Sequence, residues 1–114
     1  MENDVLKKIA HILELRKQAE PETSYVAGLY ARGINAVLKK IGEEATEVVI
    51  AANSGDKDAI IHETADLWFH TLVMLAQCNL GPEDILNELE KRFGKSGLEE
   101  MAARKNHYNP DQKQ

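Results

Sequence analysis

Apolar residues recur at helical spacing from the start of the chain. They lie three or four residues apart, as in an amphipathic helix. Glu20-Pro21 ends this first segment, because a residue before proline is disfavoured in helical conformation. Ser24 can then cap a short helix that reaches Tyr30, with Gly33 as its stop. The apolar residues of the first segment are Val5, Leu6, Ile9, Ile12 and Leu13.

Two longer segments follow, separated by the turn-forming sequence Asn53-Ser54-Gly55. Ser54 or Asp56 can cap the second of them, which runs from about Lys57 to Gln77. Its second half is apolar on nearly every side and therefore needs cover all round. Because so short a chain offers little cover, we predict a homodimer with this helix near the shared core. The apolar stripe of the first long segment comprises Ile34, Val37, Leu38, Ile41, Ala45, Val48 and Ala52.

A fifth helix is predicted to begin at Pro82 and to stop at Gly94. Its apolar residues, expected to form a buried face, are Ile85, Leu86, Leu89 and Phe93. Ser96-Gly97-Leu98-Glu99 reads as a capping box for a last helix through about Lys105. No strand-like alternation occurs. The pattern therefore predicts an all-α bundle of about five to six helices, with one domain over residues 1–105 and a polar tail over 106–114.

Composition narrows the class of protein. A chain of 114 residues with 43% hydrophobic and 29% charged residues is typical of one globular domain. Its apolar runs are far shorter than the ~20 residues of a membrane span. The acidic start Met-Glu-Asn-Asp without an apolar core does not resemble a secretion signal, and the single cysteine, Cys78, favours a reducing cytoplasm. A net charge of −5 argues against general nucleic-acid binding.

The acidic residues are clustered. Seven of the 19 lie between Glu43 and Asp66, and two pairs stand out, Glu44-x-x-Glu47 and Glu63-x-x-Asp66. Residues three apart share one side of a helix, so each pair presents its carboxylates together. Glu44 falls on the border of the apolar stripe, whereas Glu43 points away from it. If the two long helices pack antiparallel, both pairs lie level, ~12 to 16 Å from the turn.

Converging carboxylates need a counter-ion, and an oxygen-rich site that also meets phosphates suits Mg²⁺. The alternative is an ordinary solvated helix face. Lys40, one turn before Glu44, is either its ion-pair partner or a phosphate contact. His62 and His70 are interpreted as packing or supporting residues, because no zinc motif accompanies them. Trp68 and Phe69 are expected to be core or dimer contacts rather than a platform for stacking bases, and Cys78 is expected to be a small core residue near a helix end.

These residues carry a family resemblance. The segment 42–52, Gly-Glu-Glu-Ala-Thr-Glu-Val-Val-Ile-Ala-Ala, and the segment 63–67, Glu-Thr-Ala-Asp-Leu, resemble the phosphoribosyl-ATP pyrophosphatases. Those are small enzymes of histidine biosynthesis within the MazG-like all-α nucleotide pyrophosphohydrolases. The similarity continues in the segments 23–27, 92–94 and 96–100 and spans about Pro21 to Arg104. The flanking segments are what distinguish this narrower family from other MazG-like proteins. At the four acidic positions the sequence does not depart from the family's pattern.

The resemblance implies an activity and a site. The activity is hydrolysis of 1-(5-phosphoribosyl)-ATP to 1-(5-phosphoribosyl)-AMP and pyrophosphate, with Mg²⁺ as cofactor, in a homodimer. By match to the motif, the metal ligands and catalytic residues are Glu44, Glu47, Glu63 and Asp66. The substrate's phosphates need basic partners, and the candidates are Lys40, Arg32, Lys39, Lys91, Arg92 and Lys95.

Two other functions stay open at this point. One keeps the chemistry but changes the substrate to another nucleoside triphosphate, as in other MazG-like enzymes. The other is a non-catalytic helical dimer that serves as an interaction module and whose acids serve only solubility.

Overall fold

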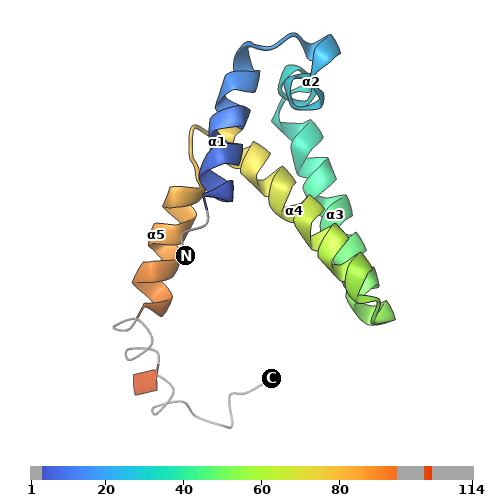
Figure 1. Cartoon of the computed structure of the whole chain (residues 1–114), viewed down its shortest axis with the longest axis vertical. Coiled ribbons are helices and arrows are strands. Elements are labelled where there is room, and N and C mark those ends of the chain that lie inside the picture. Colours follow the sequence, from blue (N-terminus) through green and yellow to red (C-terminus); the bar gives the residue numbers. More distant parts are fainter. Residues whose placement is uncertain (1–3, 95–101, 104–114) are drawn as a thin grey trace. The chain divides into compact units, whose positions relative to one another are not determined.

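The chain folds into α-helices in a computed structural model that describes residues 4–94 and 102–103 (Figure 1). No strand occurs within these ranges. Contacts divide the chain into two compact units, Met1–Pro82 and Glu83–Gln114, which are treated separately below. No helix of the described residues is long and apolar enough to cross a membrane. The elements in order are α1 (Val5–Leu15), η1 (Arg16–Gln18), η2 (Pro21–Thr23), α2 (Tyr25–Arg32), α3 (Ile34–Ser54), α4 (Lys57–Gln77) and α5 (Pro82–Phe93).

Most helix boundaries follow from local chemistry and agree with the predicted ones, but α1 ends at Leu15, before the predicted stop at Glu20-Pro21, and α3 continues through Asn53 and Ser54 of the predicted turn. The Ser24 hydroxyl accepts a hydrogen bond from the backbone N–H of Ala27 and caps α2. Gly33, with φ at 89°, ends α2 and starts α3 in a conformation that side chains disfavour. At the next turn Gly55 has φ at 79°, and Asp56 caps α4 by accepting hydrogen bonds from two backbone N–H groups.

Helices α3 and α4 form an antiparallel hairpin, and this hairpin is the main frame of the first unit (Figure 1). Helix α1 packs on α4, and α2 packs on α3. Each of these four helices contributes one side chain that is at most 2% exposed to the core where they meet: Leu13 of α1, Leu29 of α2, Val37 of α3 and Val73 of α4. Apolar burial of this kind is the dominant stabilising contribution. The core lies toward the end of the hairpin that is remote from its loop.

Tyr30 adds a polar contact to this core. Its hydroxyl donates a hydrogen bond of 2.9 Å to the main-chain oxygen of Leu13 and so ties α2 to α1. Burial, and then the negative charge of Glu14, raise the pKa of the Tyr30 phenol. The neutral, hydrogen-bonded form is therefore the one the fold favours, and it persists throughout the neutral pH range.

Several predicted core positions are wrong for this chain. In α3 the buried face is rotated from the predicted stripe, so that Val37, Glu44 and Ala51 are buried while Leu38 is 45% exposed. Trp68, which was expected in the core or at a dimer contact, is not a core residue of the single chain, since it is 58% exposed. Cys78 is exposed, because it follows the last residue of α4.

Helix α5 begins at Pro82 and ends before Gly94, as predicted, and all of it after Pro82 belongs to the second unit. Its apolar face was expected to be buried, but its residues are 44–46% exposed, since the described part of this unit has no second long helix to cover them. Arg92 donates a hydrogen bond to Glu88 and lowers the pKa of that carboxyl. The predicted last helix, from Ser96 to Lys105, lies outside the described residues except for helical Ala102 and Ala103.

Candidate functional site

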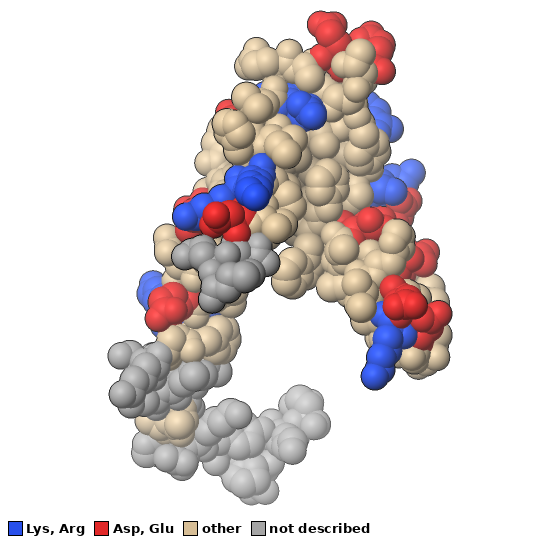
Figure 2. Space-filling view, viewed as in Figure 1, with Lys and Arg blue, Asp and Glu red and all other residues tan. Residues whose placement is uncertain are grey.

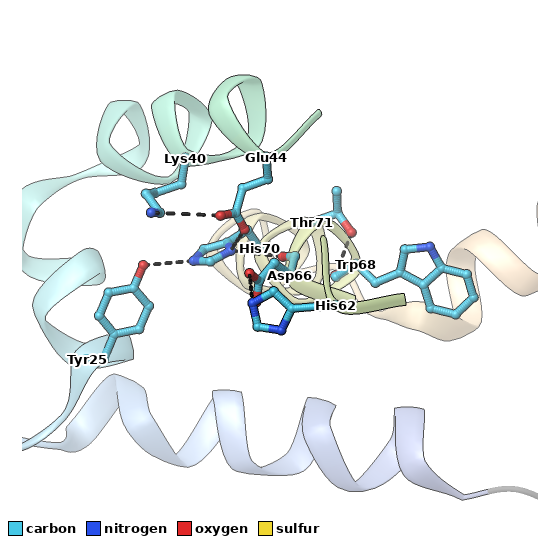
Figure 3. A network of polar contacts seen from close by, with 8 residues as sticks. All are labelled: Tyr25, Lys40, Glu44, His62, Asp66, Trp68, His70 and Thr71. Carbon is cyan, nitrogen blue, oxygen red and sulfur yellow. Dashed lines mark hydrogen bonds and ion pairs between the residues drawn. The ribbon is translucent and has the colours of Figure 1, made fainter. Parts of the chain in front are cut away.

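A buried carboxylate and a buried imidazole meet where α3 packs on α4 (Figure 3). Glu44 of α3 is 8% exposed and His70 of α4 is 5% exposed. Oε1 of Glu44 lies 2.7 Å from Nδ1 of His70. Charged groups are seldom buried unless they are paired, and this pair is therefore the candidate functional site of the first unit.

The His70 ring is held on both sides. Nδ1 lies 2.9 Å from the main-chain oxygen of Asp66, one turn earlier in α4, and Nε2 lies 2.8 Å from the hydroxyl oxygen of Tyr25 in α2. The rings of Tyr25 and Phe69 both meet the imidazole edge to face. The orientation of His70 is therefore determined by residues from two helices.

The buried carboxylate oxygen of Glu44, Oε1, accepts no hydrogen bond. The hydrogen on Nδ1 of His70 is aimed at the Asp66 carbonyl, and Oε1 of Glu44 is buried with no hydrogen-bond partner of its own. Nζ of Lys40 lies 3.9 Å from the other oxygen, Oε2, at the edge of ion-pair range. An unsatisfied buried acceptor costs about 1–3 kcal/mol, and more when it is charged. A cation at Oε1 would remove this cost.

The other predicted acidic residues are more accessible. Glu47 is exposed, whereas Glu63 and Asp66 are half-buried. Oδ2 of Asp66 lies 3.5 Å from Nε2 of exposed His62, one turn earlier in α4. Among the residues that the structure describes, no three His, Cys, Asp or Glu side chains are grouped closely enough to hold a metal ion. The convergence of all four carboxylates is thus not formed by this single chain. Glu43 is exposed, as predicted.

The predicted phosphate-binding residues are spread over the chain. Lys40 lies beside Glu44, and exposed Lys39 is its neighbour in α3. Lys91 and Arg92 belong to the second unit, where Arg92 is paired with Glu88, and Lys95 lies outside the described residues. In Figure 2 lysine and arginine side chains are interspersed with acidic ones along the α3–α4 hairpin. Of the candidates within the described residues, Lys40 alone forms an ion pair with a predicted ligand, Glu44, at 3.9 Å.

Arg32 contributes to an open hollow of about 590 Å³ at η2 and α2. This size lies within the usual range of small-molecule sites. Tyr25 lines the hollow and also contacts His70, so the hollow adjoins the carboxylate site through this one side chain. The residues that line it are Pro21, Glu22, Thr23, Ser24, Tyr25, Gly28, Ala31 and Arg32.

No spacing in the sequence singles out Tyr25 as a site residue or indicates a side-chain partner for His70. The i, i+4 spacing of Asp66 and His70 was visible and foreshadows the bond from the ring to the main-chain oxygen. The contact with Tyr25 joins residues 45 positions apart and had no local signal in the chain.

Fold and site together define an all-α protein with a buried carboxylate–imidazole pair between antiparallel helices. The phosphoribosyl-ATP pyrophosphohydrolase family model matches residues 6–93. Since this match covers most of the chain, the protein belongs to the phosphoribosyl-ATP pyrophosphohydrolase family and is an enzyme of that hydrolase class. The predicted family is confirmed.

Three relatives, each named phosphoribosyl-ATP pyrophosphatase, match over nearly their whole length. The protein of Methylococcus capsulatus is 61% identical over 102 residues, which cover 90% of this chain and 97% of the relative. That of Hydrogenovibrio crunogenus is 53% identical, with 91% and 96% covered. That of Methylibium petroleiphilum is also 53% identical, with 90% and 86% covered.

Proposed function

We propose that this enzyme hydrolyses 1-(5-phosphoribosyl)-ATP to 1-(5-phosphoribosyl)-AMP and pyrophosphate in histidine biosynthesis, with Mg²⁺ held by helix carboxylates. The observation that supports it most is the match over most of the chain to relatives that bear this enzyme's name. The buried carboxylate of Glu44 supports the metal requirement independently. Membership of an enzyme family weighs against the alternative of a non-catalytic helical module.

The donor set of the site fits Mg²⁺. This ion prefers oxygen ligands and usually takes one or two carboxylates, with waters and substrate phosphates completing its shell. Oε1 of Glu44 is a buried acceptor without a hydrogen bond, which suits a cation. When bound, Mg²⁺ supplies Lewis acidity: it neutralises phosphate charge and makes water easier to deprotonate. The residues proposed to hold it are Glu44, Glu47, Glu63 and Asp66.

The proposed reaction breaks one phosphoric anhydride bond. Water adds its oxygen to the α-phosphorus of the substrate, and the bond from the α-phosphorus to the oxygen that bridges it to the β-phosphorus breaks, so that pyrophosphate leaves. A site carboxylate accepts the proton that the water loses. Most of the rate enhancement comes from positioning and from stabilising developing charge, as in other phosphoryl transfers.

Basic side chains are proposed to neutralise the phosphate charge of the substrate that Mg²⁺ does not neutralise. Lys40 is favoured because its Nζ already lies beside Glu44. Arg32 is the second candidate, since it lines the hollow next to Tyr25. Both belong to the first unit, whose helices carry the four acidic residues. Lys39, Lys91, Arg92 and Lys95 are weaker candidates.

A homodimer is also proposed. Large apolar side chains on α3 and α4 remain exposed in the single chain: Val49 by 67%, Ile50 by 57%, Ile61 by 68% and Trp68 by 58%. So much accessible apolar surface on two helices is typical of a protein-protein interface. A second copy covering this surface would also bring additional carboxylates near the site.

Substrate choice is the direct test of the proposed activity. We expect pyrophosphate release from phosphoribosyl-ATP in the presence of Mg²⁺, at a much higher kcat/KM than from ATP, GTP, CTP, UTP or dUTP. A coupled pyrophosphate assay on the full chain measures this. Turnover of the nucleoside triphosphates alone would contradict the proposed substrate and favour another MazG-like activity.

A further inference from the structure

The ring of His70 in α4 contacts Tyr25 of α2, Glu44 of α3 and the main chain of its own helix (Figure 3). We propose that His70 is a positioning residue, which holds the carboxylate of Glu44 in the orientation that binds Mg²⁺. This proposal rests on the proposed function, because it assumes that Glu44 is a metal ligand. It assigns a positioning role to a residue outside the acidic motif. Tyr25 supports this role, because its hydroxyl contacts the His70 ring.

The hydrogen-bond network determines the tautomer of the ring. The main-chain oxygen of Asp66 only accepts hydrogen bonds, so Nδ1 of His70 must be the donor across their 2.9 Å separation. Nε2 lies 2.8 Å from the hydroxyl oxygen of Tyr25, and a ring that carries its hydrogen on Nδ1 alone accepts this hydrogen bond at Nε2. With both nitrogens engaged, the ring cannot turn without breaking a hydrogen bond in a site that is 5% exposed.

The fixed ring then limits where Glu44 can lie. Oε1 of Glu44 is 2.7 Å from Nδ1, while the hydrogen of Nδ1 is aimed mainly at Asp66. The ring blocks Oε1 on one side, and because this oxygen accepts no hydrogen bond, its lone pairs stay available for a cation. Groups that orient a metal-binding side chain from behind typically change metal affinity or activity about 10–100-fold when they are replaced.

The same ring also connects two of the predicted ligands. Its bond to the main-chain oxygen of Asp66 lies in the turn of α4 that carries the Asp66 carboxylate. Its contact with Glu44 links that turn to α3. His70 therefore contacts the carboxylate of one predicted ligand and the main chain of another, one from each helix of the hairpin.

Two replacements separate the functions of the two ring nitrogens. An asparagine amide nitrogen lies close to the position of Nδ1, whereas a glutamine amide nitrogen reaches the position of Nε2. His70→Asn therefore keeps the donor beside Glu44 and Asp66, and His70→Gln keeps only the contact with Tyr25. We expect His70→Gln to bind Mg²⁺ about 10–100-fold more weakly than the wild type, and His70→Asn to remain close to the wild type.

Mg²⁺ affinity is measured on the full chain by calorimetry, with Mn²⁺ paramagnetic resonance as a second readout, and thermal unfolding without metal reports the fold. His11→Gln, at an exposed histidine of α1, is the matched control and should bind like the wild type. Equal affinity of folded His70→Gln and the wild type would overturn the role of His70 alone. Should His70→Gln not fold, weak binding by folded His70→Asn would overturn it. If the wild type binds no Mg²⁺, the metal site of the proposed function fails as well.

Discussion

Glu47→Gln and Asp66→Asn are each expected to lower kcat for phosphoribosyl-ATP by about 10²–10³-fold, the range seen when a preorganised charge-stabilising group is removed. Each replacement keeps the size of the side chain but exchanges an anionic Mg²⁺ ligand for a neutral amide. Glu47 is exposed and Asp66 is half-buried, so neither variant leaves a cavity. The thermal midpoint without metal should therefore stay close to that of the wild type.

Glu43→Gln is the matched control for this experiment. Glu43 belongs to the same acidic segment of α3, but it is exposed, one residue before buried Glu44 and on a different side of the helix. Its replacement removes the same charge from the chain and should leave kcat near the wild-type value. Wild-type activity in Glu47→Gln or Asp66→Asn would show that the ligand set is wrong. An equally deep loss in Glu43→Gln would show that overall negative charge, rather than particular ligands, is what matters.

Leu29→Ala is expected to cause the largest loss of stability, about 3 kcal/mol within the usual range for buried leucine. Leu29 is 0% exposed and packs in the core that joins α2 to the other helices of the first unit. The smaller side chain removes buried apolar surface and leaves a cavity that rigid neighbours fill only in part. Because α2 also carries Tyr25, activity should fall at temperatures where the variant is still largely folded. Urea unfolding followed by circular dichroism measures the stability.

Leu15→Ala provides the comparison. Leu15 is 52% exposed at the end of α1, so the same change in chemistry should cost less than about 1 kcal/mol. A loss at Leu15 as large as the loss at Leu29 would contradict the described core. A negligible loss at Leu29 would do the same.

The helices could be predicted from the sequence because their signals are local. Ser24, Gly33, Asp56 and Pro82 act on the backbone within a few residues, and the observed boundaries lie at or next to them. The burial of Glu44 was also within reach, since one helical angle places it at the border of the apolar stripe.

The long-range contacts of the site could not be predicted in the same way. The bond between Tyr25 and His70 depends on how α2 packs against α4, which no spacing within either helix specifies. Amphipathic patterning also overestimated burial within the single chain, as the exposed face of α5 and the 45% exposure of Leu38 show. A pattern indicates which side of a helix is apolar, but it does not say whether this chain or another one covers it.

The central claim is that this enzyme uses Mg²⁺ on its helix carboxylates to break the anhydride bond between the α- and β-phosphates. The most direct test is to follow the products of phosphoribosyl-ATP by ³¹P nuclear magnetic resonance, with Mg²⁺ present and after its removal with EDTA. We predict phosphoribosyl-AMP and pyrophosphate in equal amounts with Mg²⁺, and no turnover after its removal. Release of inorganic phosphate with phosphoribosyl-ADP, or undiminished turnover after metal removal, would contradict the claim.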